Sequence, residues 1–536
     1  MIIFVADLFA EQYGGGAELT TEALIESSLL PTKKIISSSL TTKIMQQYGG
    51  CFWVFANFHQ VPQECLLFAA QNLQYSVLEY DYKFCEYRSP EKHIEATGTC
   101  DCSTKRTGKL VSIFFNNAKV VWWMSYKQKE KYLDNFPFLK AANNKVLSSV
   151  LSADTLKHIM SLNTTNKNHK WVILNSGSWI KGTQAAVNYA EENKLEYEVI
   201  GGLTYEAFLQ KLSISKGIIF FPPGGDTCPR MIIEAKLLEC ELLLNDNVQH
   251  KDETWFETKD SCLEYLKERT LVFWGEIEKY VNFLPTKTIK DSAKYIVVSP
   301  FYNAEKYLPK CIQSLKRQTH TNFKCILVDD MSSDKSVEVA SEMIQGDNRF
   351  KIIKNRVKSF ALKNIHASLS TESINDDDII ILLDGDDWLS SSKSLESLNS
   401  LYAAKDCWAT YGSYIMFPHG IRGPEPSQYP SSVVDNNLYR TDQWRASHLR
   451  TFKYHLWEKI EEEDLKNSQG EFYDVSYDQA IMLPILEMAG PRAKFVEPIL
   501  HVYNKENPLN VDKVKTTKQV KTAQEIRNKK KYRRIQ

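Results

Sequence analysis

Three carboxylates stand directly behind an apolar run of strand length in this chain. The run covers residues 379–383, and Asp384-Gly385-Asp386-Asp387 follows it at once. A continuous apolar run of this length predicts a strand that is buried on both faces of a parallel sheet. Crowded carboxylates repel one another unless water or a cation neutralises them, and Mg²⁺ or Mn²⁺ prefers oxygen ligands. The stretch therefore favours an α/β fold with a cation and diphosphate site at the carboxyl edge of a sheet. A solvated acidic turn that caps the next helix is the alternative.

The sequence before this cluster repeats the same pattern of a strand followed by polar residues. We expect a strand that begins at Ile296, a helix over residues 304–318 and a second strand over residues 325–328, which runs into Asp329 and Asp330. Residues 351–354 form a third candidate strand. A strand, a helix and a strand, with acidic residues at two strand ends, is the layout of a nucleotide-binding sheet.

These motifs together resemble the inverting family 2 glycosyltransferases of the GT-A fold. The resemblance covers residues 294–510 and rests on Pro300-Phe-Tyr-Asn303, Val328-Asp329-Asp330 and Asp384-Gly-Asp-Asp387. It departs from the family at Met331, where the family usually has Gly, and a different turn is expected there. A nucleotidyltransferase shares the sheet and the acidic site, but such enzymes usually have a Gly-rich loop with Arg or Lys after the first strand.

The resemblance implies a role for each residue of the cluster. Asp329 would contact the base of a nucleotide-sugar donor, which is expected to be UDP-linked. Asp384 and Asp386 would form the Asp-x-Asp site for Mn²⁺ or Mg²⁺, and Asp384 would also contact the donor. A cation there would neutralise the charge that grows on the leaving diphosphate.

The same resemblance places a catalytic base after the acidic cluster. Asp478 opens an apolar helix and is the expected base, with Asp474 as the weaker choice and a mere helix cap as the alternative role. His501 is a candidate third metal ligand, although a packed or surface histidine is the alternative. Three further residues are expected on the acceptor side of the site: Trp444, His448 and Arg450.

The first half of the chain has its own alternation of strands and helices, which predicts parallel sheets. Strand-like runs cover residues 1–6, 52–56, 110–115, 120–123, 171–175, 197–200, 217–221 and 241–244, and helical patterns cover residues 17–27, 181–193, 204–214 and 229–238. The polar stretch at residues 163–169 is expected to link two such sheets. We therefore expect Rossmann-like domains at residues 1–165 and 166–290 in a GT-B arrangement. A GT-A domain with a mixed, mainly parallel sheet would follow at residues 291–512, and a basic tail at residues 513–536.

Three motifs of the first half suit a nucleotide-sugar. The glycines at Tyr13-Gly14-Gly15-Gly16 precede a helix whose N-terminus favours negative charge, although a plain loop is the alternative. Lys181 lies at a helix start, where it can meet a diphosphate. Asp226 and Glu234 flank another helix N-terminus, with Pro229 expected at its first position.

These motifs resemble the retaining family 4 glycosyltransferases. The resemblance implies donor contacts by Gly15, Lys181 and Asp226, and catalytic roles for Glu234 and His59. The family generally has Glu where this chain has Asp226, and the Arg that partners the lysine has no clear counterpart. A degenerate module that binds the acceptor glycan or scaffolds the second half is therefore the alternative.

The overall composition limits the partners of the protein. Lysines and arginines equal acidic residues at 66 each, so a general nucleic-acid binder is not expected. No apolar run approaches the roughly 20 residues of a membrane span, and the start of the chain has no basic region of a signal peptide. The eleven cysteines are scattered, as in a protein with reduced thiols, so we expect a cytoplasmic enzyme.

Two local features leave alternatives open. Cys85, His93, Cys100 and Cys102 share one polar segment and are either a zinc site or a loop with reduced thiols, although their spacing is not that of a common zinc motif. Residues 513–536 carry ten basic residues and one acidic residue. They are either a solvated, partly helical tail or a weak contact to the inner membrane surface, where each basic residue adds at most about 1 kcal/mol.

The sequence as a whole predicts a bifunctional glycosyltransferase. The first half would be a retaining enzyme and the second half a metal-dependent inverting enzyme, and both would extend a polysaccharide or a lipid-linked glycan. The alternative is that only the second half is catalytic.

Overall fold

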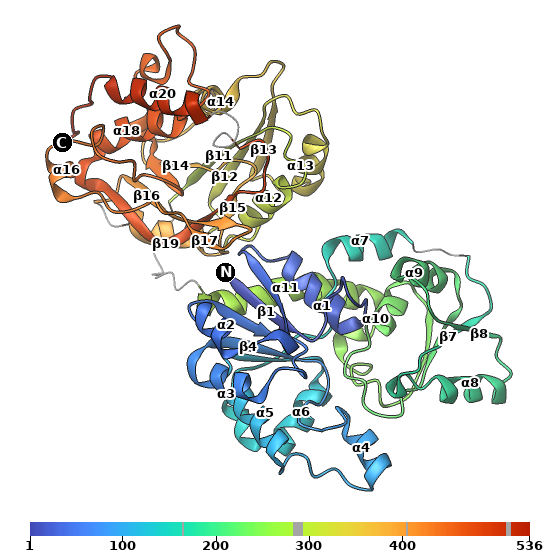
Figure 1. Ribbon diagram of the computed structural model, residues 1–536. Helices are drawn as coiled ribbons and strands as arrows, with labels where there is room; N and C mark the ends of the chain where they lie inside the picture. The colour runs from blue at the N-terminus through green and yellow to red at the C-terminus, as the bar shows by residue number, and fades with distance from the viewer. Residues whose placement is uncertain (163–165, 282–292, 404–405, 511–515) are drawn as a thin grey trace. The chain divides into compact units, whose positions relative to one another are not determined.

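The computed structural model describes residues 1–162, 166–281, 293–403, 406–510 and 516–536, which Figure 1 shows as coloured ribbons. The chain divides into two compact units. The first unit comprises Met1–Ser28 and Thr32–Val281, and the second comprises Leu29–Pro31 and Asn282–Gln536.

The first unit contains two sheets, and every pairing within them is parallel. The six-stranded sheet has the order β2-β1-β3-β4-β5-β6 and the four-stranded sheet has the order β10-β9-β7-β8. The strands of the first sheet are β1 (Ile2–Ala6), β2 (Thr32–Ile36), β3 (Phe52–Phe55), β4 (Gln74–Glu79), β5 (Val120–Trp123) and β6 (Asn144–Val146). Those of the second sheet are β7 (Trp171–Leu174), β8 (Tyr197–Ile200), β9 (Gly217–Phe220) and β10 (Glu241–Leu244).

Helices connect these strands, as parallel pairing requires. They are α1 (Gly16–Glu26), α2 (Thr42–Gln47), α3 (Gln63–Asn72), α4 (Pro90–Thr97), α5 (Arg106–Asn117), α6 (Tyr126–Asn135), α7 (Ala153–Ser161), α8 (Thr183–Glu192), α9 (Tyr205–Ile214), α10 (Arg230–Leu237) and α11 (Lys259–Val281). Helix α11 follows the second sheet but packs on elements of the first. The Trp274 indole donates a hydrogen bond to the carbonyl of Leu24 at 3.0 Å, and Phe273 packs on Trp122.

One expected strand of the first unit is wrong. Residues 110–115 lie in helix α5 rather than in a strand. Val111, Phe114 and Phe115 are buried there at spacings of three and four residues, so they share one helix face. That face packs against the aromatic core, where the ring of Phe114 lies 4.7 Å from that of Tyr75.

The second unit is built on a nine-stranded mixed sheet. Its order is β13-β12-β11-β14-β18-β16-β19-β15, with β17 paired to β16. The strands are β11 (Tyr295–Phe301), β12 (Phe323–Asp329), β13 (Phe350–Lys354), β14 (Ile379–Leu382), β15 (Trp388–Leu389), β16 (Ala409–Phe417), β17 (Ile421–Arg422), β18 (Arg450–Lys453) and β19 (Ala493–Asn504). The first four in spatial order are parallel, and the sheet turns antiparallel where β14 pairs with β18.

The helices of the second unit cover this sheet. They are α12 (Leu308–Lys316), α13 (Ser336–Ile344), α14 (Phe360–Thr371), α15 (Ser394–Tyr402), α16 (Ser431–Asp435), α17 (Tyr454–Trp457), α18 (Tyr477–Ala489) and α20 (Thr516–Asn528). Helix α18 is buried continuously from Ala480 to Ala489 and forms the centre of one core. The helix expected over residues 304–318 begins only at Leu308, because residues 304–307 form a turn.

The predicted fold class is confirmed. The first half has parallel sheets and the second half has a mixed sheet, in an α/β fold throughout. The change between the first two sheets falls between β6 and β7, around the expected linker, of which residues 163–165 lie outside the described residues. The expected boundary at residues 290 and 291 also lies outside them.

The basic segment near the end of the chain is not a separate solvated tail. Ile526 of α20 is 1% exposed and belongs to the core around α18. The guanidinium of Arg440 donates to the carbonyl of Ile526 at 2.6 Å and forms a buried ion pair with Glu487. The backbone N–H of Tyr532 donates to the same Glu487 at 3.0 Å. The segment is therefore part of the second unit.

This packing gives a test of the role of α20. Ile526→Ala is expected to lower the free energy of unfolding by about 2–5 kcal/mol, since it leaves a cavity in the core. Val520→Ala is the matched control, because Val520 lies on the same helix and is 56% exposed. It should change the free energy by no more than about 0.5 kcal/mol. Urea titration of the full-length protein measures both, and equal midpoints for the two variants would contradict the packing.

Candidate active site

The acidic cluster of the second unit lies at the carboxyl ends of β11 and β14. The backbone N–H of Gly385 donates to the carbonyl of Pro300 at 3.0 Å, so the turn is held tightly against the end of β11. A Cβ at position 385 would lie 2.5 Å from the Cβ of Phe301. Only glycine fits this contact, and the turn that it permits places Asp384 and Asp386 at a cavity.

The cavity has a volume of about 430 Å³. Its walls come from the end of β11, the starts of α14 and α18, strand β18 and the end of β19 with the loop beyond. Its lining includes Pro300, Tyr302, Asp330, Lys358, Asp384, Asp386, His448, Arg450, Asp474, Tyr477, Asp478, Tyr503, Asn507 and Gln519. The predicted residues Asp384, Asp386 and Asp478 therefore share one cavity.

The carboxylates of the cluster are held by neutral donors. Tyr477 donates its hydroxyl hydrogen to Asp384, with distances of 2.6 and 2.8 Å to the two carboxylate oxygens. Asn507 donates to Asp386 at 2.6 Å. Burial raises the pKa of Asp386 to about 8, and repulsion from Asp387 and Asp384 adds to the effect. Among the described residues, no basic side chain forms an ion pair with Asp384 or Asp386. Carboxylates in such surroundings favour the binding of a cation.

Asp387 is turned away from the cavity. Its carboxylate hydrogen-bonds Nε2 of His501 at 2.9 Å and accepts from the backbone N–H of Asn504 at 2.8 Å. Both side chains are buried, and burial raises the pKa of Asp387 well above its usual value. Burial, with a smaller effect of Arg450, lowers the pKa of His501 to about 3. His501 therefore contacts Asp387, whereas the sequence predicted it as a third metal ligand with Asp384 and Asp386.

The two histidines near Asp387 form a second group of possible metal ligands. The rings of His448 and His501 stack at 4.4 Å, and each offers a ligand atom within 4.8 Å of Asp387. Nδ1 of His501 is buried and has no hydrogen-bond partner among the described residues. Carboxylates and neutral imidazoles are ligands that Mn²⁺ accepts. The residues at this edge of the sheet thus fit a divalent cation, with Asp384 and Asp386 on the side of the cavity.

Asp478 lies in the first turn of α18, as the sequence predicted. Its carboxylate is 3.4 Å from Nη1 of Arg450, whose Nη2 lies 3.0 Å from Nδ1 of His448. His448 and Arg450 line the cavity as expected, whereas Trp444 packs against the core. Asp474 also lines the cavity, but it forms an ion pair with Lys518 at 2.7 Å. Of the two aspartates, Asp478 is the one that the guanidinium orients at the cavity.

The structure separates the roles of Asp329 and Asp330. Asp329 accepts from the backbone N–H of Ser332 at 2.9 Å and is not among the lining residues. Asp330 lines the cavity and accepts from the N–H groups of Ser359 and Phe360 at 2.7 and 3.0 Å. Asp330 thus holds the start of α14 against the cavity. The sequence did not reveal this role, because its partners lie about 30 residues further on.

Met331 adopts a left-handed backbone conformation. Its φ of 66° is in the left-handed region, which costs a residue with a side chain about 1–2 kcal/mol. The side chain is 46% exposed, so nothing prevents this conformation. The different turn expected at Met331 therefore stays a prediction.

Two residues of the first unit that were predicted to bind a nucleotide-sugar lie close together. Nζ of Lys181 lies 3.0 Å from the carboxylate of Asp226. Gly15 is the N-cap residue of α1, but the carboxylate of Glu18 already occupies the first turn of that helix. Burial raises the pKa of Glu18. A carboxylate at a helix N-terminus uses the site that a phosphate would need.

Glu234 is buried rather than open to a ligand. It is 2% exposed, pairs with Nε of Arg230 at 2.8 Å and accepts from the hydroxyl of Tyr205 at 2.6 Å. Burial raises its pKa, although Arg230 acts in the opposite direction. Pro229 is the N-cap residue of α10, one position before the expected one.

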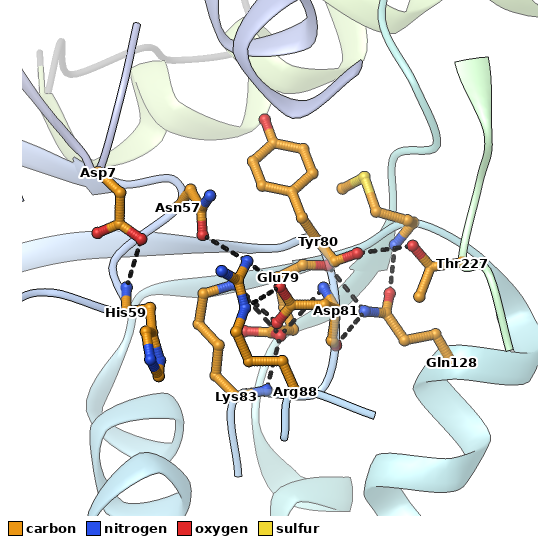
Figure 2. A network of polar contacts seen from close by, with 11 residues as sticks. Asp7, Asn57, His59, Glu79, Tyr80, Asp81, Lys83, Arg88, Gln128 and Thr227 are labelled. Atoms are coloured by element: carbon orange, nitrogen blue, oxygen red, sulfur yellow. Dashed lines mark hydrogen bonds and ion pairs between the residues drawn. The ribbon is translucent and has the colours of Figure 1, made fainter. Parts of the chain in front are cut away.

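His59 lies beside a polar network that the sequence did not reveal (Figure 2). Its backbone N–H donates to Asp7 at 3.2 Å, at the carboxyl ends of β1 and β3. Arg88 connects the neighbouring strand ends, with Nε donating to Asp81 at 2.7 Å and Nη2 to Asn57 at 3.1 Å. The segment Glu79-Tyr-Asp81-Tyr-Lys83 carries charged residues of this network. The strand β4, which ends at Glu79, was not predicted from the sequence, so the segment was not recognised.

The pKa values of two buried carboxyl groups in this network are shifted in opposite directions. Burial raises the pKa of Glu79 to about 8. Burial acts on Asp81 as well, but Lys83 and Arg88 outweigh it and lower the pKa of Asp81 to about 2. Burial thus favours the neutral form of Glu79, whereas Lys83 and Arg88 favour the ionised form of Asp81.

Comparison with known proteins connects the second unit to one family. Residues 296–455 match the family model described as glycosyl transferase family 2. The second unit thus contains a glycosyltransferase family 2 domain, which includes Asp329, Asp384 and Asp386. Asp478 and His501 lie beyond the matched residues.

Individual relatives agree with that class. Glycosyltransferase GlyG of Streptococcus pneumoniae is 31% identical over 118 residues, which are 22% of this chain and 38% of GlyG. The uncharacterized glycosyltransferase EpsJ of Bacillus subtilis is 24% identical over 225 residues, which are 41% of this chain and 62% of EpsJ. The chain thus spans less than two thirds of either relative.

Solved structures resemble this chain only at low TM-scores and low sequence identity. TarS of S. aureus is 15% identical with a TM-score of 0.32, over 39% of this chain and 36% of TarS. The mannosyltransferase PcManGT from Pyrobaculum calidifontis, in complex with GDP-Man and Mn²⁺, is 14% identical with a TM-score of 0.29, over 44% of this chain and 64% of PcManGT. At these scores the likeness says nothing about the site.

The raised pKa of Asp386 predicts a conflict between stability and metal binding. The fold favours the protonated carboxyl, so this stability is fully present below a pH of about 3.8 and is lost as the pH rises through about 8. At pH 8 without metal, Asp386→Asn should therefore be more stable than the wild type by at least about 1 kcal/mol, or about 2–4 °C. Thermal unfolding of the full-length protein measures this.

Two controls accompany this measurement. Mn²⁺ should raise the thermal midpoint of the wild type and leave Asp386→Asn unchanged. Asp376→Asn makes the same chemical change at an exposed position before β14 and should behave as the wild type. A lower midpoint for Asp386→Asn at pH 8, or an equal response to Mn²⁺, would contradict the assignment.

Proposed function

We propose that the protein is a glycosyltransferase that moves sugars from nucleotide-sugar donors to a growing glycan. One observation carries the proposal. Asp384, Asp386 and Asp478 converge on a cavity of about 430 Å³ in the unit that matches glycosyl transferase family 2. The donor is proposed to be UDP-linked, and the acceptor a polysaccharide or a lipid-linked glycan.

The proposed reaction is a single displacement with inversion. The acceptor hydroxyl oxygen forms a bond to the anomeric carbon as the bond from that carbon to the diphosphate oxygen breaks. Asp478 takes the proton of the hydroxyl, and the nucleoside diphosphate leaves with the electron pair. Arg450, 3.4 Å from the Asp478 carboxylate, orients the base toward the cavity.

Asp384 and Asp386 would hold Mn²⁺ or Mg²⁺, with His501 and Asp387 as further candidate ligands. The cation would neutralise charge on the diphosphate. Tyr477 fixes the carboxylate of Asp384 and Asn507 that of Asp386, so both oxygens are oriented before any ligand arrives.

The first unit is proposed to be a second, retaining transferase. Lys181 and Asp226, 3.0 Å apart at the carboxyl edge of their sheet, support donor binding there, with Gly15, His59 and Glu234 as the other family 4-like positions. Two observations favour the alternative of a binding or scaffolding module. Glu234 is committed to Arg230, and Glu18 occupies the helix N-terminus beside Gly15.

Donor hydrolysis by site variants tests both units. Nucleotide-sugars are screened with Mn²⁺ on the wild type, Asp386→Asn and Asp226→Asn. Loss of a cation at the diphosphate or of a charged donor contact is expected to lower turnover by about 10²–10³-fold. With two active units, each variant lowers turnover of a different donor. Asp478→Asn should retain donor binding but lose transfer to the acceptor.

The choice of variants in the first unit follows from the structure. Glu234→Ala would leave the buried Arg230 unpaired, which costs about 3–5 kcal/mol, so it cannot separate activity from folding. Asp246→Asn is the control, because Asp246 is exposed in the turn after β10 of the same unit. The alternative is that only the second unit is catalytic. It would be established if Asp386→Asn lost all turnover while Asp226→Asn kept the turnover of the wild type. Unchanged turnover in both variants would refute the proposal.

A weak contact with an anionic membrane is the remaining part of the proposal. Among the described helices, none is long and apolar enough to cross a bilayer. Lys521, Lys530 and Arg533 are exposed on the basic segment. Their triple replacement by Glu is expected to weaken binding to vesicles with anionic lipid by at least about tenfold, at about 1 kcal/mol per charge. Flotation with neutral vesicles is the control, and equal flotation of variant and wild type would remove the idea.

A further inference from the structure

Four ligand-type side chains converge in the segment between β4 and α5. Cys85 lies in a turn after β4, His93 on α4, and Cys100 and Cys102 in the turns that lead to α5. Each offers one ligand atom, and all four atoms lie within 4.8 Å of one another. The residues are up to 17 positions apart in sequence, so the fold, and not local spacing, brings them together.

Three of the distances between these atoms are close to those of a tetrahedral site. Sγ of Cys85 lies 3.7 Å from Sγ of Cys100 and 3.6 Å from Nδ1 of His93. Sγ of Cys102 lies 3.3 Å from the same Nδ1. Zinc bonds of about 2.3 Å to sulfur and about 2.0–2.1 Å to nitrogen place tetrahedral ligands about 3.8 Å (S···S) and about 3.6 Å (S···N) apart.

A disulfide does not explain this arrangement. The sulfur atoms of Cys85 and Cys100 are 3.7 Å apart, whereas a disulfide needs about 2.05 Å. All the described cysteines are free. Thiols also form only weak hydrogen bonds, which give little reason to gather three of them around one imidazole.

The surroundings position each ligand. Ser89 accepts from the N–H of Lys92 and caps α4, which ends at Gly98 in the left-handed region with φ 85°. The ring of Tyr87 stacks on His93 at 4.6 Å. Gly108 packs so closely that a Cβ there would lie 2.3 Å from the carbonyl oxygen of Cys102. This close contact at Gly108 holds the backbone of Cys102 in place.

Helix α4 has no apolar face of its own. Of its eight residues only Pro90 and His93 are buried, while Ile94 is 48% exposed. Figure 1 shows this helix at the margin of the first unit. Hydrophobic packing therefore gives it little attachment, and small segments of this kind are commonly held by a metal or a disulfide.

We propose that Cys85, His93, Cys100 and Cys102 bind one zinc ion in a structural site. Four protein ligands close the coordination sphere, so no position is left for water or substrate. The site would fix α4 and the turn before it. That segment carries Arg88 of the strand-end network and Glu95, which accepts from the indole of Trp179 at 2.9 Å. The zinc would thus fasten α4 near the loop that carries Trp179, independently of any sugar transfer.

Metal analysis of the full-length protein tests the site. The wild type, purified without chelators, should contain about one zinc per chain and no iron–sulfur absorbance. Cys100→Ser should lose at least about nine tenths of the zinc to a competing chromogenic chelator. Cys51→Ser is the matched control, because Cys51 is also half-buried but lies at the amino end of β3, whereas the four ligands follow the carboxyl end of β4. It should retain its zinc.

A second measurement avoids dependence on the folding of variants. Zinc is removed from the wild type with a chelator and then restored, and trypsin cleavage within residues 86–106 is followed. Cleavage should rise at least about tenfold without zinc and return to its first level with it. Zinc below about half an equivalent in the wild type, unchanged zinc in Cys100→Ser, or a disulfide in place of the metal would each overturn the proposal.

Discussion

The contact between Gly385 and the end of β11 is the constraint on which the catalytic part of the molecule depends. The absence of a side chain lets the turn after β14 approach Pro300 and Phe301, and the backbone hydrogen bond holds it there. The three carboxylates of this turn then point in different directions. The carboxylates of Asp384 and Asp386 face the cavity, while that of Asp387 is directed into the protein as an anchor for β19.

Both units keep carboxyl groups in surroundings that oppose their ionisation. Burial raises the pKa of Asp386 in the second unit and of Glu79 in the first to about 8. In each case the carboxyl group lies at the carboxyl edge of a sheet, where hydrogen bonds hold it at a fixed position. Folding free energy is spent on this arrangement, since a neutral core of the same shape would be more stable. Such strained electrostatics are typical of functional sites.

Much of the fold could be predicted from the sequence, because buried parallel strands are continuous apolar runs. Residues 379–383 and the polar groups that follow them predicted the sheet edge and the cavity side chains Asp384 and Asp386, whereas Asp478 was predicted from the resemblance to family 2. The strand predicted at residues 110–115 was wrong, because a short apolar run has the same pattern on a buried helix face as in a strand. Asp330 and Tyr477 were missed because their partners are distant in sequence. The burial of Glu234 depends on Arg230 and Tyr205, and no motif records such packing.

The packing of α20 has a consequence for the order of events during synthesis. Ile526 completes the core beneath α18, and Gln519 contributes to the cavity wall. The second unit therefore cannot assemble its site until about 250 residues after the first unit has been made. At about 5–20 residues per second, the first unit is present for roughly 10–50 s before its neighbour can work. A nascent chain that stops before residue 526 would carry a finished first unit and a second unit whose core lacks Ile526.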